Sequence, residues 1–365
     1  MPKTSLHFSK KLILWYLEHK RDLPWRTTKS PYRIWLSEIM LQQTRVAQSL
    51  PYYKVFISEF PTVHDLANAS EEKVLKLWQG LGYYSRARNL HTTAKYISEE
   101  LNGEFPVTFK GLLQLKGVGD YTASAIASIS FNLPTAVVDG NVYRVLSRYF
   151  GIETSINSSA GIKEFKKLAQ QLIDAEKPGI YNQAIMEFGA RQCKPQNPVC
   201  TICVLNDNCV ALQQKKISEL PVKLKKTKIK KCYFNYIVLL SENNKTILQQ
   251  RTSKGIWQQL YEFPLIETDA EVTIEALQET TTFKTISEKF IISSVVLYND
   301  KSIIHKLSHR HLYARFWIAE TNKELLNGCS ISEINNFPVP KLIANFISQF
   351  FGNKFSHKNK KNSYI

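Results

Sequence analysis

The sequence predicts a mainly α-helical domain followed by a smaller α+β domain. Helix-type periodicity and helix-capping signals dominate the first two hundred residues, with few β-branched alternations. A lysine-rich stretch follows, and strand-like runs come after it. A chain of 365 residues is also too long for one core of ordinary size. We therefore expect a helical domain over 1–213, a basic linker over 214–231, an α+β domain over 232–350 and a disordered basic tail over 351–365.

The first helix start of interest is Ser30 followed by Pro31, an N-cap and a first helical position. Glu38 lies in the middle of this helix, among apolar neighbours such as Trp35 and Leu41. We expect its carboxyl group in a dry pocket, where burial raises the pKa and suits a general acid, although a solvated surface glutamate is the alternative. Further amphipathic helices are expected near 45–58, 71–78, 85–101, 108–115, 120–131, 141–149, 161–175 and 180–190.

A glycine-rich turn joins two of these helices. It consists of Lys116, Gly117, Val118 and Gly119, and Asp120 is expected as the N-cap of the second helix. Two glycines permit a tight hairpin whose backbone N–H groups point at an anion, and the dipole of the following helix adds to this. The turn predicts a phosphate clamp, although similar turns also occur in helix bundles without that function.

Asp139 precedes Gly140 and Asn141 at another expected helix start. An aspartate in this position is a good N-cap, and that structural role alone is one interpretation. The second interpretation is compatible with the first. A carboxylate that accepts hydrogen bonds from backbone N–H groups stays ionised at neutral pH and can stabilise a developing positive charge.

Four cysteines close the helical half: Cys193, Cys200, Cys203 and Cys209, with C-x6-C-x2-C-x5-C spacing. Four thiols in one short loop indicate a metal site, since a disulfide framework would spread cysteines through a small secreted domain. One tight pair flanked by wider arms favours a [4Fe-4S] cluster, and a structural zinc is the second choice.

Strand patterns begin after the linker, which holds eight lysines, Glu219 and Pro221. We expect strands over 233–240, 246–250, 291–297 and 313–319, with helices over 273–278 and 339–350.

The charge balance points to a polyanionic partner. There are 48 Lys and Arg against 31 Asp and Glu, a formal net charge of +17, which favours nucleic acid binding, although a basic chain can also simply be soluble. No apolar stretch approaches the roughly 18 residues of a membrane span, and residues 1–20 lack the apolar core of a signal peptide. We expect an intracellular, cytoplasmic protein with no membrane contact.

These motifs together resemble a known family. Glu38 with Leu-Gln-Gln-Thr at 41–44, Gly-Leu-Gly-Tyr-Tyr-Ser-Arg-Ala-Arg-Asn-Leu at 80–90, the hairpin, Val-Asp-Gly-Asn at 138–141 and the four cysteines are similar to those of adenine DNA glycosylases of the MutY type, within the helix-hairpin-helix, endonuclease III-like superfamily. The resemblance covers about 8–213. It implies a helix-hairpin-helix glycosylase fold, a [4Fe-4S] cluster, and a monomeric, nucleoid-associated bacterial repair enzyme that acts on double-stranded DNA.

The resemblance also implies an activity and catalytic roles. The substrate is adenine mispaired with 8-oxoguanine, or with guanine, and the product is an abasic site. Glu38 protonates the flipped adenine at N7, and Asp139 stabilises the oxocarbenium-like sugar. Tyr121 stands where endonuclease III-type enzymes place a lysine, so a monofunctional enzyme is implied, with Tyr121 and Asn141 positioning the sugar or water. Lys116, where the family often has proline, leaves weak lyase activity open.

Other residues match DNA-contacting positions of the family. Trp25, Arg26 and Gln183 match positions that line the adenine pocket. Gln43, Leu81 and Tyr83 match residues that enter the base stack. For the aromatic and leucine side chains, core packing is the alternative.

The second domain resembles the lesion-recognition domain of the same family, a relative of the Nudix fold. Residues 255–264 resemble its entrance strand, but no R-E-x-x-E-E helix follows, so pyrophosphohydrolase activity should be absent. Leu307, Ser308 and His309 resemble a loop that contacts 8-oxoguanine, with a surface turn as the alternative. Two other functions stay open: a bifunctional oxidised-pyrimidine glycosylase and lyase, and a catalytically silent DNA-binding protein.

Overall fold

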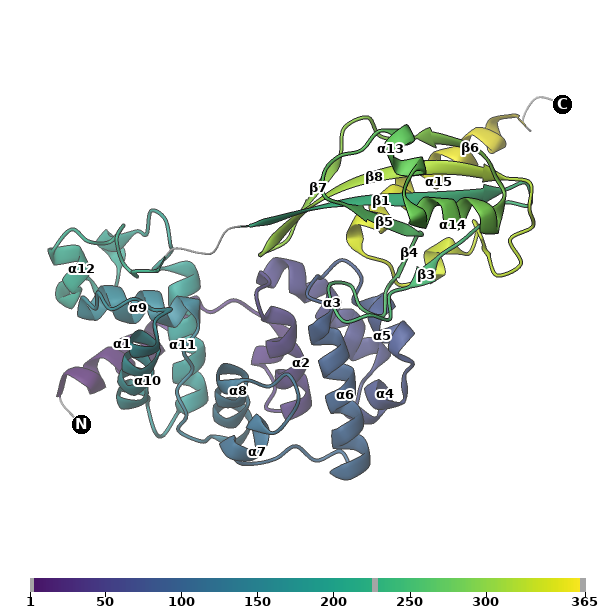
Figure 1. Cartoon of the computed structure of the whole chain (residues 1–365). Helices are drawn as coiled ribbons and strands as arrows, with labels where there is room; N and C mark the ends of the chain where they lie inside the picture. Colours follow the sequence, from purple (N-terminus) through teal and green to yellow (C-terminus); the bar gives the residue numbers. More distant parts are fainter. Residues whose placement is uncertain (1–2, 225–228, 362–365) are drawn as a thin grey trace. The chain divides into compact units, whose positions relative to one another are not determined.

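The computed structural model describes residues 3–224 and 229–361, which form two compact units (Figure 1). The first contains residues 3–69 and 88–224, and the second contains residues 70–87 and 229–361. Residues 70–87, which we expected in the helical domain, belong to the second unit. The reason is visible in their hydrogen bonds: Lys76 Nζ donates to the Phe337 carbonyl (3.3 Å), and Gln79 Oε1 accepts from Val339 N (3.2 Å).

The first unit is helical, as expected. Its helices are α1 (Lys3–His19), η1 (Pro24–Arg26), α2 (Pro31–Leu41), α3 (Val46–Glu59), α4 (Val63–Asn68), α6 (Ser85–Glu100, shared with the second unit), α7 (Phe109–Leu113), α8 (Asp120–Phe131), α9 (Gly140–Phe150), α10 (Ser159–Leu172), α11 (Pro178–Arg191), η2 (Cys200–Ile202), η3 (Asn206–Asn208) and α12 (Val210–Gln213). The sequence analysis did not anticipate α1 and α4.

Two helix starts test the capping arguments. Ser30 caps α2, and its side chain accepts from Arg33 N. Asp120 is not the N-cap of α8, because the extended backbone of Gly119 takes that position. Asp120 is the first helical residue, and its carboxylate pairs instead with Lys166 at 2.8 Å.

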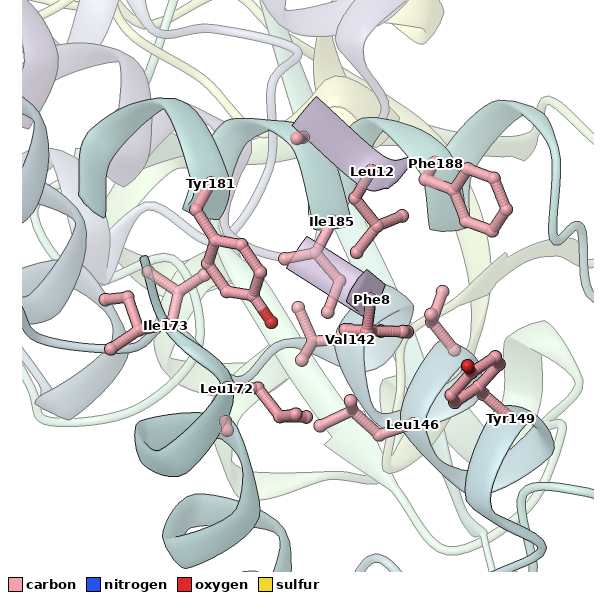
Figure 2. Packing of buried hydrophobic residues seen from close by; sticks show 14 of the residues in the cluster. Phe8, Leu12, Val142, Leu146, Tyr149, Leu172, Ile173, Tyr181, Ile185 and Phe188 are labelled. Carbon is pink, nitrogen blue, oxygen red and sulfur yellow. The ribbon is translucent and has the colours of Figure 1, made fainter. Parts of the chain in front are cut away.

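The core of the first unit joins helices that are distant in the sequence. Phe8 and Leu12 of α1 pack against Leu146 of α9 and against Ile185 and Phe188 of α11 (Figure 2). All five side chains are buried. Burial of their apolar area therefore stabilises the packing of α1, α9 and α11 against one another.

The second unit is a mixed α+β fold, as expected. Its sheet has the strand order β5 (Leu265–Thr268), β1 (Lys230–Ser241), β8 (Arg310–Thr321) and β6 (Ile292–Leu297), and β7 (Ile303–Lys306) also pairs with β8. β1 and β8 run parallel along their whole length, while the other pairs are antiparallel. Around the sheet lie α5 (Glu71–Leu77), β2 (Lys245–Thr246), β3 (Gln249–Gln250), β4 (Tyr261–Glu262), α13 (Ile274–Gln278), α14 (Thr281–Phe290), β9 (Cys329–Ser330), η4 (Ile334–Asn336) and α15 (Lys341–Lys361).

Two expectations about the connecting and terminal segments differ from the structure. The first part of the expected linker lies on the first unit, because Leu220 is buried and Val222 O accepts from Ile156 N at 3.0 Å. The expected disordered tail is helical as far as Lys361, since α15 continues beyond Phe350 and a formed helix adds residues at little cost. Residues 362–365 lie outside the described residues.

Among the described residues, no helix is both long enough and apolar enough to cross a membrane.

Candidate active site

A cavity of about 170 Å³ in the first unit brings the expected catalytic residues together. Its walls come from η1, α2, α8, α11 and the start of α9, which are far apart in the sequence. Seven residues singled out in the sequence line it: Trp25, Arg26, Glu38, Tyr121, Asp139, Asn141 and Gln183.

Glu38 is buried in the middle of α2, with 4% of its surface exposed. Burial raises the pKa of its carboxyl group to about 7, and the nearby negative charge of Asp139 raises it further, while hydrogen bonding from Tyr121 and the charge of Arg26 oppose this. Its Oε2 atom is buried without a hydrogen-bond partner. Glu38 is thus buried in the wall of the cavity, and one oxygen of its carboxyl group has no hydrogen-bond partner.

Asp139 is the N-cap of α9 and also lines the cavity. Its Oδ1 accepts from Asn141 N (2.9 Å) and Val142 N (2.8 Å), and its Oδ2 accepts from Asn141 Nδ2 (2.8 Å). Burial raises the pKa of Asp139, and these three N–H donors and Arg144 oppose that shift. N–H donors pair best with a carboxylate, so these hydrogen bonds favour the ionised form of Asp139 against the effect of burial.

Tyr121 lines the same cavity as the two carboxyl groups. Its hydroxyl donates to Met186 Sδ at 3.1 Å and also interacts with Glu38. Burial raises its pKa well above the usual value, followed by the charges of Glu38 and Asp139. The phenol is therefore neutral and can act as a hydrogen-bond donor.

A buried ion cluster that was not predicted from the sequence lies at the cavity wall. Glu187 of α11 accepts from Arg21 Nη2 and Arg26 Nη2, both at 2.6 Å, and its side chain is fully buried. Although burial alone would raise it, these partners lower the pKa of Glu187 to about 2. Its position could have been inferred, because Glu187 follows Gln183 by four residues and so shares its helix face.

The remaining pocket residues are also held by specific contacts. Gln183 Oε1 accepts from the Tyr16 hydroxyl at 2.6 Å, so its NH₂ group is left for other partners. Trp25 is buried with its ring 5.1 Å from that of Tyr53, in an edge-on arrangement. Tyr16 was not singled out in the sequence, since it precedes the matched motifs.

The glycine-rich hairpin lies between α7 and α8. Val118 is buried and its N–H donates to the Leu115 carbonyl at 3.0 Å, whereas Lys116, Gly117 and Gly119 are exposed. Gly117 has a φ of +81°, and a Cβ atom there would lie 2.9 Å from the Cβ of Asn89. Glycine is therefore needed at position 117, and the turn around it is exposed.

Three residues expected in the base stack differ in exposure. Gln43, in the first unit, is exposed with a φ of +55°. In the second unit Tyr83 is 44% exposed with a φ of +50°, but Leu81 is buried at 3%. The core-packing alternative thus describes Leu81 in this structure, while Tyr83 and Gln43 present their side chains outward.

The Leu307 loop lies at the turn between β7 and β8. Ser308 and His309 are exposed, and Ser308 Oγ lies 3.3 Å from His309 Nδ1. Leu307 is half-buried, and its N–H donates to Arg310 O at 2.8 Å. The two polar side chains are therefore available to a ligand at the end of the sheet.

The four expected cluster ligands are free thiols. Cys193, Cys203 and Cys209 pack on the core, and Arg148 Nη1 lies 3.5 Å from Cys193 Sγ. Burial raises the pKa of Cys203 to about 11, and the charges of the other three cysteines add to this. Over the described ranges, no group of three His, Cys, Asp or Glu side chains could hold a metal ion.

Comparisons with known proteins point in one direction. The sequence model of the HhH-GPD superfamily, base excision DNA repair proteins, matches residues 36–172, and that of the NUDIX domain matches residues 235–349. An adenine DNA glycosylase from Buchnera aphidicola subsp. Acyrthosiphon pisum is 33% identical over 362 residues, which cover 95% of this chain and 100% of that protein.

Two further matches agree with these. The adenine DNA glycosylase of Buchnera aphidicola subsp. Schizaphis graminum is 38% identical over 275 residues, covering 74% of this chain and 78% of that protein. The structure of a thermostable thymine-DNA glycosylase is similar with a TM-score of 0.54 and 29% identity, covering 58% of this chain and 98% of that one.

Proposed function

Because the chain belongs to the adenine DNA glycosylase family, with a helical HhH-GPD domain and a C-terminal NUDIX domain, we propose in detail how it acts in base-excision repair. It removes adenine that is mispaired with 8-oxoguanine or guanine in duplex DNA, and it leaves an abasic site. It acts as a monomer. The observation that carries this proposal is the single cavity in which Glu38 has an unpartnered buried oxygen and Asp139 has three N–H donors.

Glu38 is proposed as the general acid. A carboxyl group with a pKa of about 7 holds its proton at neutral pH and can still release it to a base nitrogen. Protonation of adenine at N7 makes the base a better leaving group, so the N-glycosidic bond breaks with development of positive charge on the sugar. Arg26, Gln183 and Trp25 bind and orient the flipped adenine in the same cavity.

Asp139 is proposed to stabilise that positive charge. Its carboxylate is fixed by the first turn of α9, so it needs no reorganisation when charge develops. Asn141 positions the carboxylate through the 2.8 Å hydrogen bond. Tyr121 positions the sugar or the attacking water by donating from its neutral hydroxyl, and it has no amine to form a Schiff base with the abasic sugar.

The four cysteines are proposed to hold a [4Fe-4S] cluster. A cube with one thiolate at each iron needs wider spacing than four ligands around one zinc ion. Cys193, Cys203 and Cys209 pack on the core of the first unit, and the spacing of one tight pair flanked by wider arms favours the cluster over zinc. The four thiolates would hold the cluster, and its binding would tie together the loop between α11 and α12. Arg148 holds this loop by donating to Lys194 O at 2.7 Å and Pro195 O at 3.0 Å.

The second unit is proposed to recognise the base opposite adenine. Ser308 and His309 offer polar groups to 8-oxoguanine at the β7–β8 turn, and Tyr83 of the same unit enters the base stack. In the first unit, Gln43 is likewise proposed to enter the base stack. The exposed backbone of Lys116, Gly117 and Gly119 binds a phosphate group, with Val118 buried beneath it.

The substrate proposal is tested by single-turnover release of adenine from duplexes that carry A opposite 8-oxoguanine, G or T. We expect fast release from the first, slower release from the second and little from the third, with strand breakage only after alkali. Breakage without alkali, together with an adduct trapped by borohydride, would show a lyase instead. No release from any duplex would favour a silent DNA-binding protein.

A further inference from the structure

We propose that Glu187 is a positioning residue that, by pairing with Arg26 and Arg21, keeps the proton on Glu38 at neutral pH. The proposal rests on the proposed role of Glu38 as the general acid. It concerns a buried carboxylate in the wall of the cavity to which the mechanism above assigns no step.

The geometry of the cluster shows how Glu187 holds the two arginines. Its Oε1 accepts from Arg21 N (3.1 Å) and Arg21 Nε (2.8 Å). Its Oε2 accepts from Arg21 Nη2 and from Arg26 Nη2, both at 2.6 Å. Arg26 is fixed further, because its Nη1 donates to Arg21 O at 3.0 Å and its guanidinium lies 5.4 Å from the centre of the Tyr16 ring. The cluster has two cations and one anion, so its net charge is +1.

Arg26 connects this cluster to Glu38. Its side chain is only 11% exposed, so its charge is weakly screened by solvent. A positive charge near a carboxyl group favours the ionised form, and Arg26 acts on Glu38 in this direction. Glu187 offsets the charge of Arg26 and draws its guanidinium toward α11. Without Glu187, Arg26 would favour loss of the Glu38 proton before it reaches adenine.

Glu38 is also influenced by groups from the other elements around the cavity. From α8, Tyr121 hydrogen-bonds to its carboxyl group, which favours the ionised form. From the start of α9, Asp139 favours the protonated form. Thr44 and Val46, which line the cavity before and at the start of α3, carry no charge. Asp139 therefore favours the protonated acid, and Glu187 reduces the opposing effect of Arg26.

The test is the pH dependence of single-turnover adenine release by the full chain, from a duplex with A opposite 8-oxoguanine. A required acid gives a rate that is high below its pKa and falls as the pH rises through it. Glu187→Gln raises the charge of the cluster from +1 to +2. The alkaline limb of the pH–rate profile, where the rate falls with rising pH, should therefore move to lower pH by on the order of one unit. Arg21→Gln lowers the charge to 0, so the limb should move to higher pH.

Two further variants separate charge from structure. Glu187→Asp keeps the charge of the cluster. The pH at which the rate falls should therefore stay as in the natural protein, even if the rate itself is lower. Glu187→Gln combined with Arg21→Gln restores the net charge of +1, so the limb should return toward its natural position. A purely structural role predicts the opposite for the double variant, because it removes more of the buried contacts than either single change.

The proposal is overturned if Glu187→Gln lowers the rate equally at all pH values, or if Arg21→Gln leaves the limb in place. Arg21→Gln still decides the question if Glu187→Gln does not fold, since the Arg21 side chain is 35% exposed and its loss is better tolerated. Failure of the proposed function would look different: Glu38→Gln would then retain the natural rate and limb, whatever the Glu187 variants do.

Discussion

At the scale of single residues, two carboxyl groups in one cavity have surroundings that favour different protonation states. Glu38 is buried and has an oxygen without a hydrogen-bond partner, so its neutral form is favoured. Asp139 accepts three N–H hydrogen bonds, so its ionised form is favoured. Cleavage of an N-glycosidic bond uses an acid on the base and a negative charge beside the sugar, and these are the roles that we propose for the pair.

The raised pKa of Glu38 predicts a pH-dependent cost in stability. A carboxyl group whose pKa is higher in the folded state contributes favourably at low pH, and this contribution is lost as the pH rises from the unfolded value of about 4.5 to the folded value of about 7. Glu38→Gln cannot ionise, so we expect it to be more stable than the natural protein by about 1–3 kcal/mol at pH 8, but not at pH 5. Thermal unfolding at the two pH values measures this, and an equal difference at both would contradict it.

The two interpretations of Asp139 separate by substitution. Asn is as good an N-cap as Asp, so Asp139→Asn should change the free energy of unfolding by less than about 1 kcal/mol. It removes the negative charge, however, so adenine release should slow by about 10²–10³-fold or more. Asp139→Ala should lose both the cap and the activity. If Asp139→Asn kept the natural rate, capping would be the only role of this residue.

At the scale of elements, the hairpin between α7 and α8 shows which glycine serves the fold. Gly117 has a left-handed backbone and a side chain would contact Asn89, whereas Gly119 has an extended backbone with open space around it. Substitution of Gly117 should therefore affect stability, and substitution of Gly119 should affect DNA binding.

We expect Gly117→Ala to lower the free energy of unfolding by about 1–2 kcal/mol, because a Cβ atom is strained at this φ and meets a neighbour. Gly119→Ala should leave stability nearly unchanged but weaken DNA binding, since its Cβ would lie on the exposed surface where a phosphate approaches. Thermal unfolding and DNA titration at fixed salt measure the two effects. Unchanged DNA affinity in Gly119→Ala would argue against the clamp.

The helical half could be predicted well because its signals are local. The start of α2 at Ser30 and Pro31 follows from backbone geometry that those residues prefer, and α8 spans the predicted 120–131. Glu38 and Asp139 were found from their motifs and local chemistry. Glu187 was not, because its role depends on Arg21 and Arg26, which lie more than 160 residues away and meet it only after folding.

At the scale of the whole molecule, long-range contacts decide what the sequence left open. Residues 70–87 belong to the second unit through hydrogen bonds to Phe337 and Val339, which no local pattern reveals. Leu220 lies in a lysine-rich stretch that predicted a linker, yet one buried apolar side chain ties it to the first unit. Parallel pairing of β1 with β8 likewise joins residues about 80 positions apart.

The cluster proposal makes a prediction for the intact chain. We expect about four iron and four sulfide per chain in anaerobically purified protein, because four thiolates suit one [4Fe-4S] cube. Cys203→Ser should reduce both and lower the unfolding temperature, since Cys203 packs on the core of the first unit. Cys329→Ser, in the second unit, is the matched control and should retain the iron. Stoichiometric zinc without sulfide would contradict the cluster.

The most direct test of the central claim is single-turnover adenine release from a duplex with A opposite 8-oxoguanine, comparing the natural protein with Glu38→Gln and Asp139→Asn. We expect fast release by the natural protein and a loss of at least about 10²-fold in each variant, with both still folded and bound to DNA. Natural rates in either variant would show that the two carboxyl groups do not share the chemistry as proposed.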